Sequence, residues 1–90
     1  MSGISFKAFK YGNIIMLRVY VTGGILTTNT FTTVATLSKY KPVEIVRTSL
    51  AGSGNIEVGT MYITVDGKIE LYPSSAGYYG AHVMYLTTDV

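Results

Sequence analysis

The sequence predicts an all-β fold, a compact antiparallel β-sandwich of jelly-roll type with about seven strands. Three observations predict it. Thr, Val, Ile and Tyr dominate the 90 residues, whereas Ala is scarce. No stretch keeps the i, i+3, i+4, i+7 apolar spacing of an amphipathic helix. Gly, Asn, Ser, Pro or Asp interrupts the apolar and β-branched residues at intervals of about 8 to 14 residues.

These turn residues divide the chain into seven expected strands, at 4–10, 13–22, 31–38, 43–50, 55–64, 68–72 and 78–87. Because one hydrophobic core usually serves ~100 to 200 residues, the whole chain, 1–90, is expected to form a single domain. Residues 1–3 look like a start methionine followed by small residues added for expression.

A tight turn is expected between the first two strands, at Gly12 and Asn13. The register set by this turn pairs Tyr11 with Ile14, Ala8 with Leu17, Phe6 with Val19 and Lys7 with Arg18. The hairpin then has an apolar inner face. It also has two like charges directly opposite each other, which is an unfavourable arrangement.

The hairpin between 55–64 and 68–72 has two alternative registers. A two-residue turn at Asp66 and Gly67 would mix core and solvent residues on one face. A three-residue loop, with Gly67 in the left-handed region, instead pairs Thr64 with Lys68, Ile63 with Ile69 and Met61 with Leu71. We predict the three-residue loop, which leaves Val65 exposed.

A corner is expected within TTVATLSKYKPVEIV, residues 32–46. Pro42 cannot donate a ladder hydrogen bond, and it favours an extended conformation at the residue before it. The chain should therefore leave one sheet before this proline and enter the other at Val43. Tyr40 can then cap the open end of the sandwich while the lysines on either side of it stay in water.

The composition indicates a subunit interface. Hydrophobic residues make up 48% of the sequence and charged residues 13%, and the mean hydropathy is +0.34. A short chain has a high ratio of surface to volume, so these few charges must cover a relatively large surface. The sequence has no cysteine, so no disulfide can compensate for a small core. We therefore expect part of the surface to be buried between subunits.

Catalytic, metal and cofactor sites are not indicated. The acidic residues are scattered along the sequence, as Glu44, Glu57, Asp66, Glu70 and Asp89. A pair of catalytic carboxylates would therefore arise only by an accident of tertiary structure. His82 has apolar neighbours, and such a lone histidine more often has a structural role than a catalytic or ligating one. We expect no enzyme activity, no metal and no cofactor.

Membrane and nucleic-acid partners are not favoured. No stretch reaches the ~18 to 20 apolar residues of a membrane span, and a net charge of +2 is small for nucleic-acid binding. One alternative stays open, because FKAFKY, residues 6–11, interleaves lysines with aromatic rings as single-strand platforms do. The alternative function is a small β-barrel that binds single-stranded nucleic acid. The structural explanation is an edge strand protected by lysines.

Tyrosine is the most distinctive part of the composition, with eight tyrosines and no tryptophan. Its ring and hydroxyl suit sugar stacking and wet contact surfaces, and they also suit ordinary sheet packing. Tyr78 and Tyr79 follow the turn-like PSSAG, residues 73–77. Because neighbours on a strand point to opposite faces, only one of the two can face a given groove.

Three motifs taken in order resemble a known family. They comprise Gly12, Asn13 and Ile15; then Thr36, Leu37, Tyr40 and Pro42; then Gly59, Ile63, Asp66, Gly67, Ile69 and Leu71. Together they resemble the C-terminal domains of tail-fibre, baseplate and other minor structural or receptor-binding proteins of phages that infect Gram-positive bacteria. The sequence departs from the family at Ser38, where proline is usual, and at Lys39, where glycine is usual.

The resemblance implies a non-catalytic domain of the virion that forms a homotrimer with other tail or baseplate proteins as neighbours. Such a domain either binds a bacterial surface polysaccharide or only holds the appendage together. For the saccharide we predict Tyr78 with Ser74 or Ser75 and His82. For the subunit interface we predict the last strand, where Val83, Met84, Tyr85 and Leu86 are apolar on both faces.

Overall fold

The computed structural model describes residues 3–22, 25–52, 56–74 and 77–87. These residues form strands and no helix, which confirms the predicted all-β class. The seven strands are β1 (Ile4–Tyr11), β2 (Ile14–Val21), β3 (Thr32–Thr36), β4 (Val46–Ala51), β5 (Glu57–Ile63), β6 (Lys68–Pro73) and β7 (Tyr79–Leu86). Each predicted strand is present, with ends that differ by no more than three residues.

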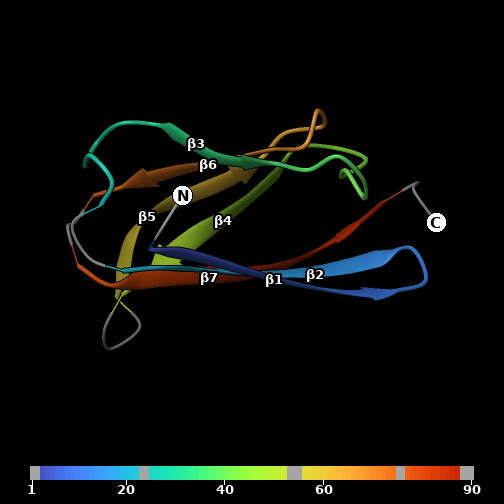
Figure 1. The fold of residues 1–90 in the computed structure, drawn as a ribbon, viewed down its shortest axis with the longest axis horizontal. Helices are drawn as coiled ribbons and strands as arrows, with labels where there is room; N and C mark the ends of the chain where they lie inside the picture. Colours follow the sequence, from blue (N-terminus) through green and yellow to red (C-terminus); the bar gives the residue numbers. More distant parts are fainter. Residues whose placement is uncertain (1–2, 23–24, 53–55, 75–76, 88–90) are drawn as a thin grey trace.

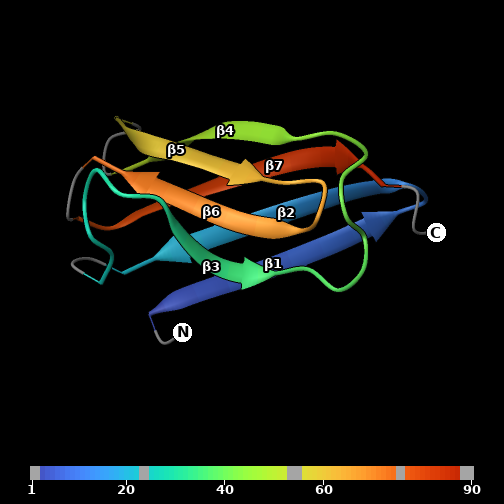
Figure 2. The ribbon, with the colours of Figure 1, turned by 90° about the horizontal axis from the view of Figure 1, so that it is seen from above.

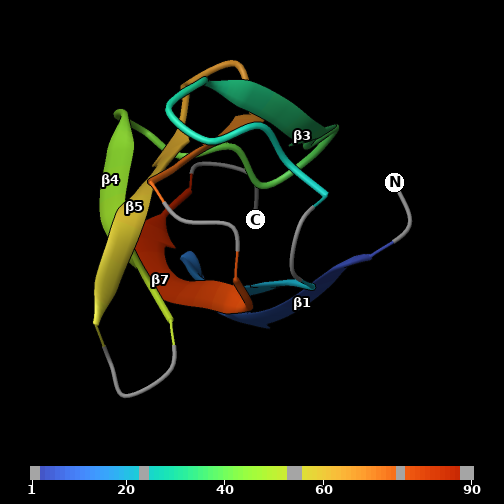
Figure 3. The same cartoon turned by 90° about the vertical axis from the view of Figure 1, so that its left-hand side faces the viewer.

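The strands form one antiparallel sheet in the order β1-β2-β7-β4-β5-β6-β3. The sheet curls strongly, so that β1, β2 and β7 face the other four strands (Figure 1). Seen end-on, it is open between its two edge strands, β1 and β3 (Figure 3). The predicted jelly-roll-like sandwich of two sheets is therefore replaced by a single open sheet. The reason is the Ala51–Gly80 pair, which joins β4 to β7 and makes the two halves continuous.

The core lies inside the curl and is built from alternate residues of the strands. In β2, for example, Leu17 and Val19 are buried whereas Arg18 and Tyr20 are exposed, as the period of two in a strand requires. The buried apolar side chains are Ile15, Leu17, Val19, Val21, Leu26, Leu50, Met61, Ile63, Ile69, Leu71, Tyr79 and Tyr85. All strands except the edge strands β1 and β3 contribute to this buried set.

The predicted register of the first hairpin is confirmed. Tyr11 lies opposite Ile14 and Lys7 lies opposite Arg18, and Gly12 has φ 62° in the turn. The inner face of β1 remains largely exposed, because no strand covers it on the open side of the sheet. Lys10 lies on this inner face, and an inward-facing lysine protects a sheet edge from pairing with another strand.

The three-residue loop of the second hairpin is also confirmed. Ile63 pairs with Ile69, and the Thr64 amide donates to the Lys68 carbonyl at 3.0 Å. Gly67 has φ 92° and donates its amide to the Thr64 carbonyl at 2.8 Å. Val65 is exposed at the tip of the loop, as predicted.

The predicted corner runs between strands of the same sheet. The chain leaves the edge strand β3, passes the end of the molecule and enters β4 (Figure 2). Tyr40 turns the chain with φ 60° and packs against the core, and its carbonyl accepts a hydrogen bond from the Tyr85 hydroxyl at 2.9 Å. The Val43 amide donates to the Leu86 carbonyl at 3.1 Å. Because the chain runs along β7 here, β4 begins at Val46 rather than at the predicted Val43.

Gly59 lies in a part of β5 that no other residue can fill without strain. Its φ is 148°, and a Cβ there would collide with the carbonyl oxygen of Tyr72 and lie 2.8 Å from Cα of Pro73. We expect Gly59→Ala to lower the free energy of unfolding by about 2 to 4 kcal/mol. Chemical denaturation measures the loss. Gly77→Ala is the control, because a Cβ at Gly77 meets nothing within 4 Å, and equal stability of the two variants would contradict the prediction.

Burial raises the pKa of the Tyr85 phenol above its ordinary value of 10.0. Since the folded-state pKa exceeds the unfolded one, this contribution to stability is complete below about pH 10 and is lost as the pH rises through the folded pKa. We expect Tyr85→Phe to cost about 1 kcal/mol at neutral pH, because the bond to Tyr40 is lost. Above pH 10, the melting temperature of the Tyr85→Phe variant should then fall less steeply with pH than that of the native protein. Tyr78→Phe, at an exposed position, should match the native protein, and an unchanged alkaline fall in Tyr85→Phe would contradict the assignment.

Candidate functional site

The outer face of β1, β2 and β7 carries side chains in four rows that run across the strands. The register fixes the rows as Ser5, Tyr20 and Gly80; Lys7, Arg18 and His82; Phe9, Met16 and Met84; and Tyr11, Ile14 and Leu86. The first two rows are polar, aromatic or cationic. The last two, which we call the apolar end, are almost entirely apolar. The face is therefore divided into two chemically different halves.

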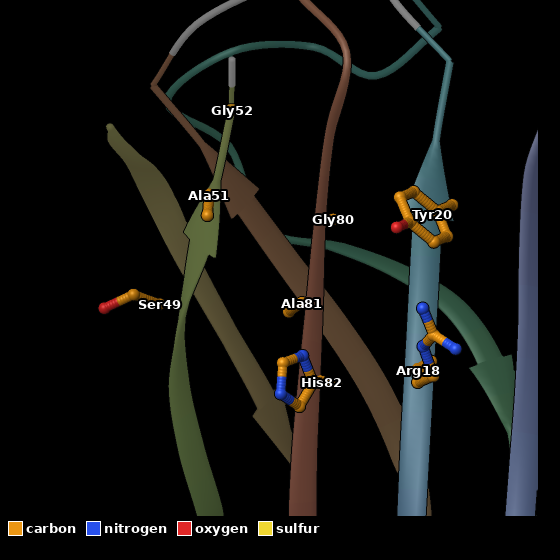
Figure 4. Close-up of a pocket in the computed structure, with 8 residues that line it drawn as sticks. All are labelled: Arg18, Tyr20, Ser49, Ala51, Gly52, Gly80, Ala81 and His82. Carbon is orange, nitrogen blue, oxygen red and sulfur yellow. The ribbon is translucent and has the colours of Figure 1, made fainter. Parts of the chain in front are cut away.

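A groove lies over the polar half, at the junction of β2, β7 and β4. Its volume is about 440 Å³, within the usual range of small-molecule sites. It is lined by Arg18, Tyr20, Ser49, Ala51, Gly52, Gly80, Ala81 and His82 (Figure 4). We call it the Tyr20 groove. Its hydrogen-bonding side chains come from three strands that are far apart in the sequence.

Gly80 and Ala51 make the groove possible, because larger residues would fill its floor. A Cβ on Gly80 would lie 2.6 Å from the Val19 carbonyl oxygen and 3.1 Å from the Tyr20 ring. The ring therefore lies close over the glycine backbone. The guanidinium of Arg18 lies 6.0 Å from the ring centroid, on the same face of β2.

A second hollow of about 300 Å³ adjoins the groove and shares four lining residues with it, Tyr20, Ala51, Gly52 and Gly80. Tyr78 lines this second hollow and is 72% exposed. Tyr20 is 61% exposed. Two accessible tyrosine side chains therefore border one continuous depression on the outer face.

The predicted saccharide residues are only partly brought together. Tyr78 and His82 line the adjoining hollow and the Tyr20 groove respectively. Ser74 lines neither, and its amide donates to the Val58 carbonyl at 2.7 Å. Ser75 lies outside the described residues. Only one of Tyr78 and Tyr79 was expected to face a given groove; Tyr79 is buried in the core and Tyr78 is exposed, yet both contribute to the lining of the adjoining hollow.

Sequence reasoning missed Tyr20 and Arg18. Both stand at exposed positions of β2 between buried residues, so the alternation of that strand could have placed them on the outer face. Their nearness to His82 depends on the pairing of β2 with β7, which joins residues 58 to 72 positions apart in the sequence. No local pattern shows that pairing.

The predicted interface strand has the expected two sides. Val83 packs against the core and Tyr85 is buried within it. Met84 and Leu86 face outward and are 64% and 51% exposed. The division between core side and outer side is thus confirmed, while the subunit contact itself stays a prediction.

The stretch FKAFKY does not form one stacking surface. Phe6 and Lys10 lie on the inner face of β1, whereas Lys7 and Phe9 lie on the outer face. The Lys7 ammonium approaches the Phe9 ring at 5.9 Å. A single-stranded nucleic acid needs rings and cations on one track, and of this stretch only Lys7, Phe9 and Tyr11 share the outer face.

The lining of the Tyr20 groove contains no carboxylate. Among the residues that the structure describes, no three His, Cys, Asp or Glu side chains are placed to hold a metal ion. The same residues include no helix long and apolar enough to cross a membrane. The groove can offer aromatic faces, cationic and neutral hydrogen-bond donors and backbone polar groups.

A scan against protein-family models finds no match for this chain, and a comparison with curated proteins finds none either.

Proposed function

We propose that this protein is a non-catalytic domain of a phage tail or baseplate appendage, part of the virion, that binds a saccharide of the host cell surface and assembles as a homotrimer. The observation that carries the proposal is the depression bordered by Tyr20 and Tyr78 on the outer face. The resemblance supplies the biological setting. Other tail or baseplate proteins would be its neighbours.

The depression has the chemistry that a sugar requires. A sugar presents an apolar face of C–H groups, which stacks on an aromatic ring, and a rim of hydroxyls, which needs donors and acceptors. Tyr20 offers the ring over Gly80, and Arg18 and His82 offer donors at its side. Tyr78 offers a second ring in the adjoining hollow. The ligand would lie along β2 and β7, from one hollow into the other.

The apolar end supports assembly. Tyr11, Ile14, Met84 and Leu86 are between 41% and 67% exposed and fall in two neighbouring rows. Val43, whose amide bonds to the Leu86 carbonyl, extends this surface and is 51% exposed. Contiguous exposed apolar side chains of this size are typical of an interface. In the proposed trimer, they pack against the neighbouring subunits.

Loss of either tyrosine ring should weaken saccharide binding. We expect Tyr20→Ala and Tyr78→Ala each to weaken binding to purified wall polysaccharides of Gram-positive bacteria by about tenfold or more, because each removes one stacking surface. Tyr20→Phe should retain most of the affinity. Binding is measured by surface plasmon resonance on immobilised polysaccharides.

Phe31→Ala is the matched control, since it removes a 55% exposed ring that packs on Tyr72 of β6 and lines neither hollow. It should bind like the native protein. If the native domain binds no polysaccharide of the panel, or if the tyrosine variants bind as well as it does, the saccharide function is wrong.

Assembly should depend on the apolar end. We expect Met84→Asp to convert the trimer to a monomer, because a charge would be buried without a partner. The molar mass from light scattering measures the change. Val65→Asp is the control, as it places the same charge at an exposed apolar residue in a hairpin loop. A native monomer, or a trimer that persists in Met84→Asp, would contradict the proposed interface.

A further inference from the structure

The second row of the outer face is entirely basic. Lys7 pairs with Arg18, and Arg18 pairs with His82, so these three side chains lie directly opposite one another on β1, β2 and β7. We call them the cationic row. All three are exposed. Lys7 and Arg18 are like charges directly opposite each other, which is unfavourable in a sheet. This repulsion carries a cost to folding, which a bound anion would offset.

In the described part of the chain, no carboxylate neutralises the positive charge of the cationic row. Lys7 and Arg18 contact the rings of Phe9 and Tyr20, at 5.9 and 6.0 Å. No carboxylate lines the hollows on either side of them. Of the described acidic residues, Glu57 and Glu70 belong to β5 and β6 and Asp66 to the loop between these strands, in the other half of the sheet. Glu44 lies beside the apolar end of β7, where it lines a hollow with Met84 and Leu86. The row thus presents uncompensated positive charge on the surface.

Hollows on both sides of β2 connect the cationic row to Tyr20. A hollow of about 330 Å³ lies over β1 and β2 and is lined by Ser5, Phe6, Lys7, Arg18 and Tyr20. It shares Arg18 and Tyr20 with the Tyr20 groove. Along β2 these two side chains are two residues apart, which is roughly 7 Å in a strand. A sugar on the ring would place an adjacent substituent at the guanidinium.

We propose that the saccharide bound by this domain is anionic, with a carboxylate or phosphate group held by the cationic row while a neighbouring sugar ring stacks on Tyr20. The inference rests on the proposed saccharide function and adds the chemical class of the ligand. Arg18, at the centre of the row, binds the anion by charge-assisted hydrogen bonds, and its planar group matches both carboxylate and phosphate. Lys7 and His82 flank the anion from the neighbouring strands.

The geometry favours an anionic saccharide over a nucleic acid. A single-stranded nucleic acid carries a charge at every nucleotide and needs a continuous basic track. Here the basic residues occupy one row only, and the next row, Phe9, Met16 and Met84, is apolar. The net charge of the whole chain is +2. The row therefore fits an isolated charged substituent better than a charged backbone.

The test compares matched polymers that differ only in charge. The probes are polygalacturonate and its fully methyl-esterified form, and a phosphomannan and the corresponding unphosphorylated mannan. A single-stranded oligonucleotide is the fifth probe. Affinities are measured for the native protein and for Lys7→Gln, Arg18→Gln and His82→Gln, with Lys68→Gln as a control that removes one exposed charge from β6, in the other half of the sheet.

We expect the native protein to bind at least one charged polymer about tenfold more tightly than its neutral partner, with an affinity that falls as salt is added. The polymer that binds identifies the source of the charge as carboxylate or phosphate. Arg18→Gln should remove about tenfold of this preference for the charged polymer, and the flanking variants a smaller factor. Lys68→Gln should behave like the native protein.

Each contrary result overturns a different statement. Equal binding of charged and neutral partners, both lost in Tyr20→Ala, would overturn the anionic class and leave the saccharide function standing. Binding of no polysaccharide would overturn both. Tightest binding to the oligonucleotide would replace the saccharide by a nucleic acid. A preference for charge that Arg18→Gln keeps would show that the cationic row is not its source.

Discussion

The arrangement of the whole molecule depends on the one residue pair that joins β7 to β4. On its other side, β7 pairs with β2 along the full length of the strand, whereas Ala51 and Gly80 are its only pair with β4 in the described residues. Both residues of this pair are small, and on the β2 side a Cβ on Gly80 would already lie 2.6 Å from the Val19 carbonyl oxygen. Beyond this pair the two strands diverge, and the sheet curls around its core. The same divergence opens the Tyr20 groove, so fold and site have a common origin.

Local features of this fold could be predicted, because turns fix them. Gly12 and Gly67 set the registers of the two hairpins, and both registers agree with the structure. The period of two also separated core from surface along β2 and β7. The number of sheets could not be predicted, since a sandwich and a curled sheet have the same alternation in each strand and differ here by the pairing of Ala51 with Gly80.

The same limit applies to the candidate site. Tyr78 was found from the sequence because it follows a turn and is large and amphipathic. Its companions in the depression come from β2 and β4, and nothing in the local sequence shows that these strands flank β7. The tyrosine content was also ambiguous by itself: Tyr79 and Tyr85 are buried in the core, and Tyr62 and Tyr72 pack around Phe31 with ring centroids 5.5 and 4.6 Å apart from it. Only the tertiary structure separates these roles.

The division of one face into a polar half and an apolar half has a consequence for affinity. The depression is shallow, and Tyr20 and Tyr78 at its border are more than half exposed, so a single site excludes little water and would bind weakly. In the proposed trimer, the apolar end is buried between subunits while the rows that contain Tyr20 and Arg18 stay accessible. Three linked sites on one repeating polymer would then bind with an avidity 10² to 10⁴ times the single-site affinity, by a rough estimate for multivalent binders. Assembly and saccharide binding would thus be two parts of one function, and the sheet keeps them compatible by placing them on different rows of the same three strands.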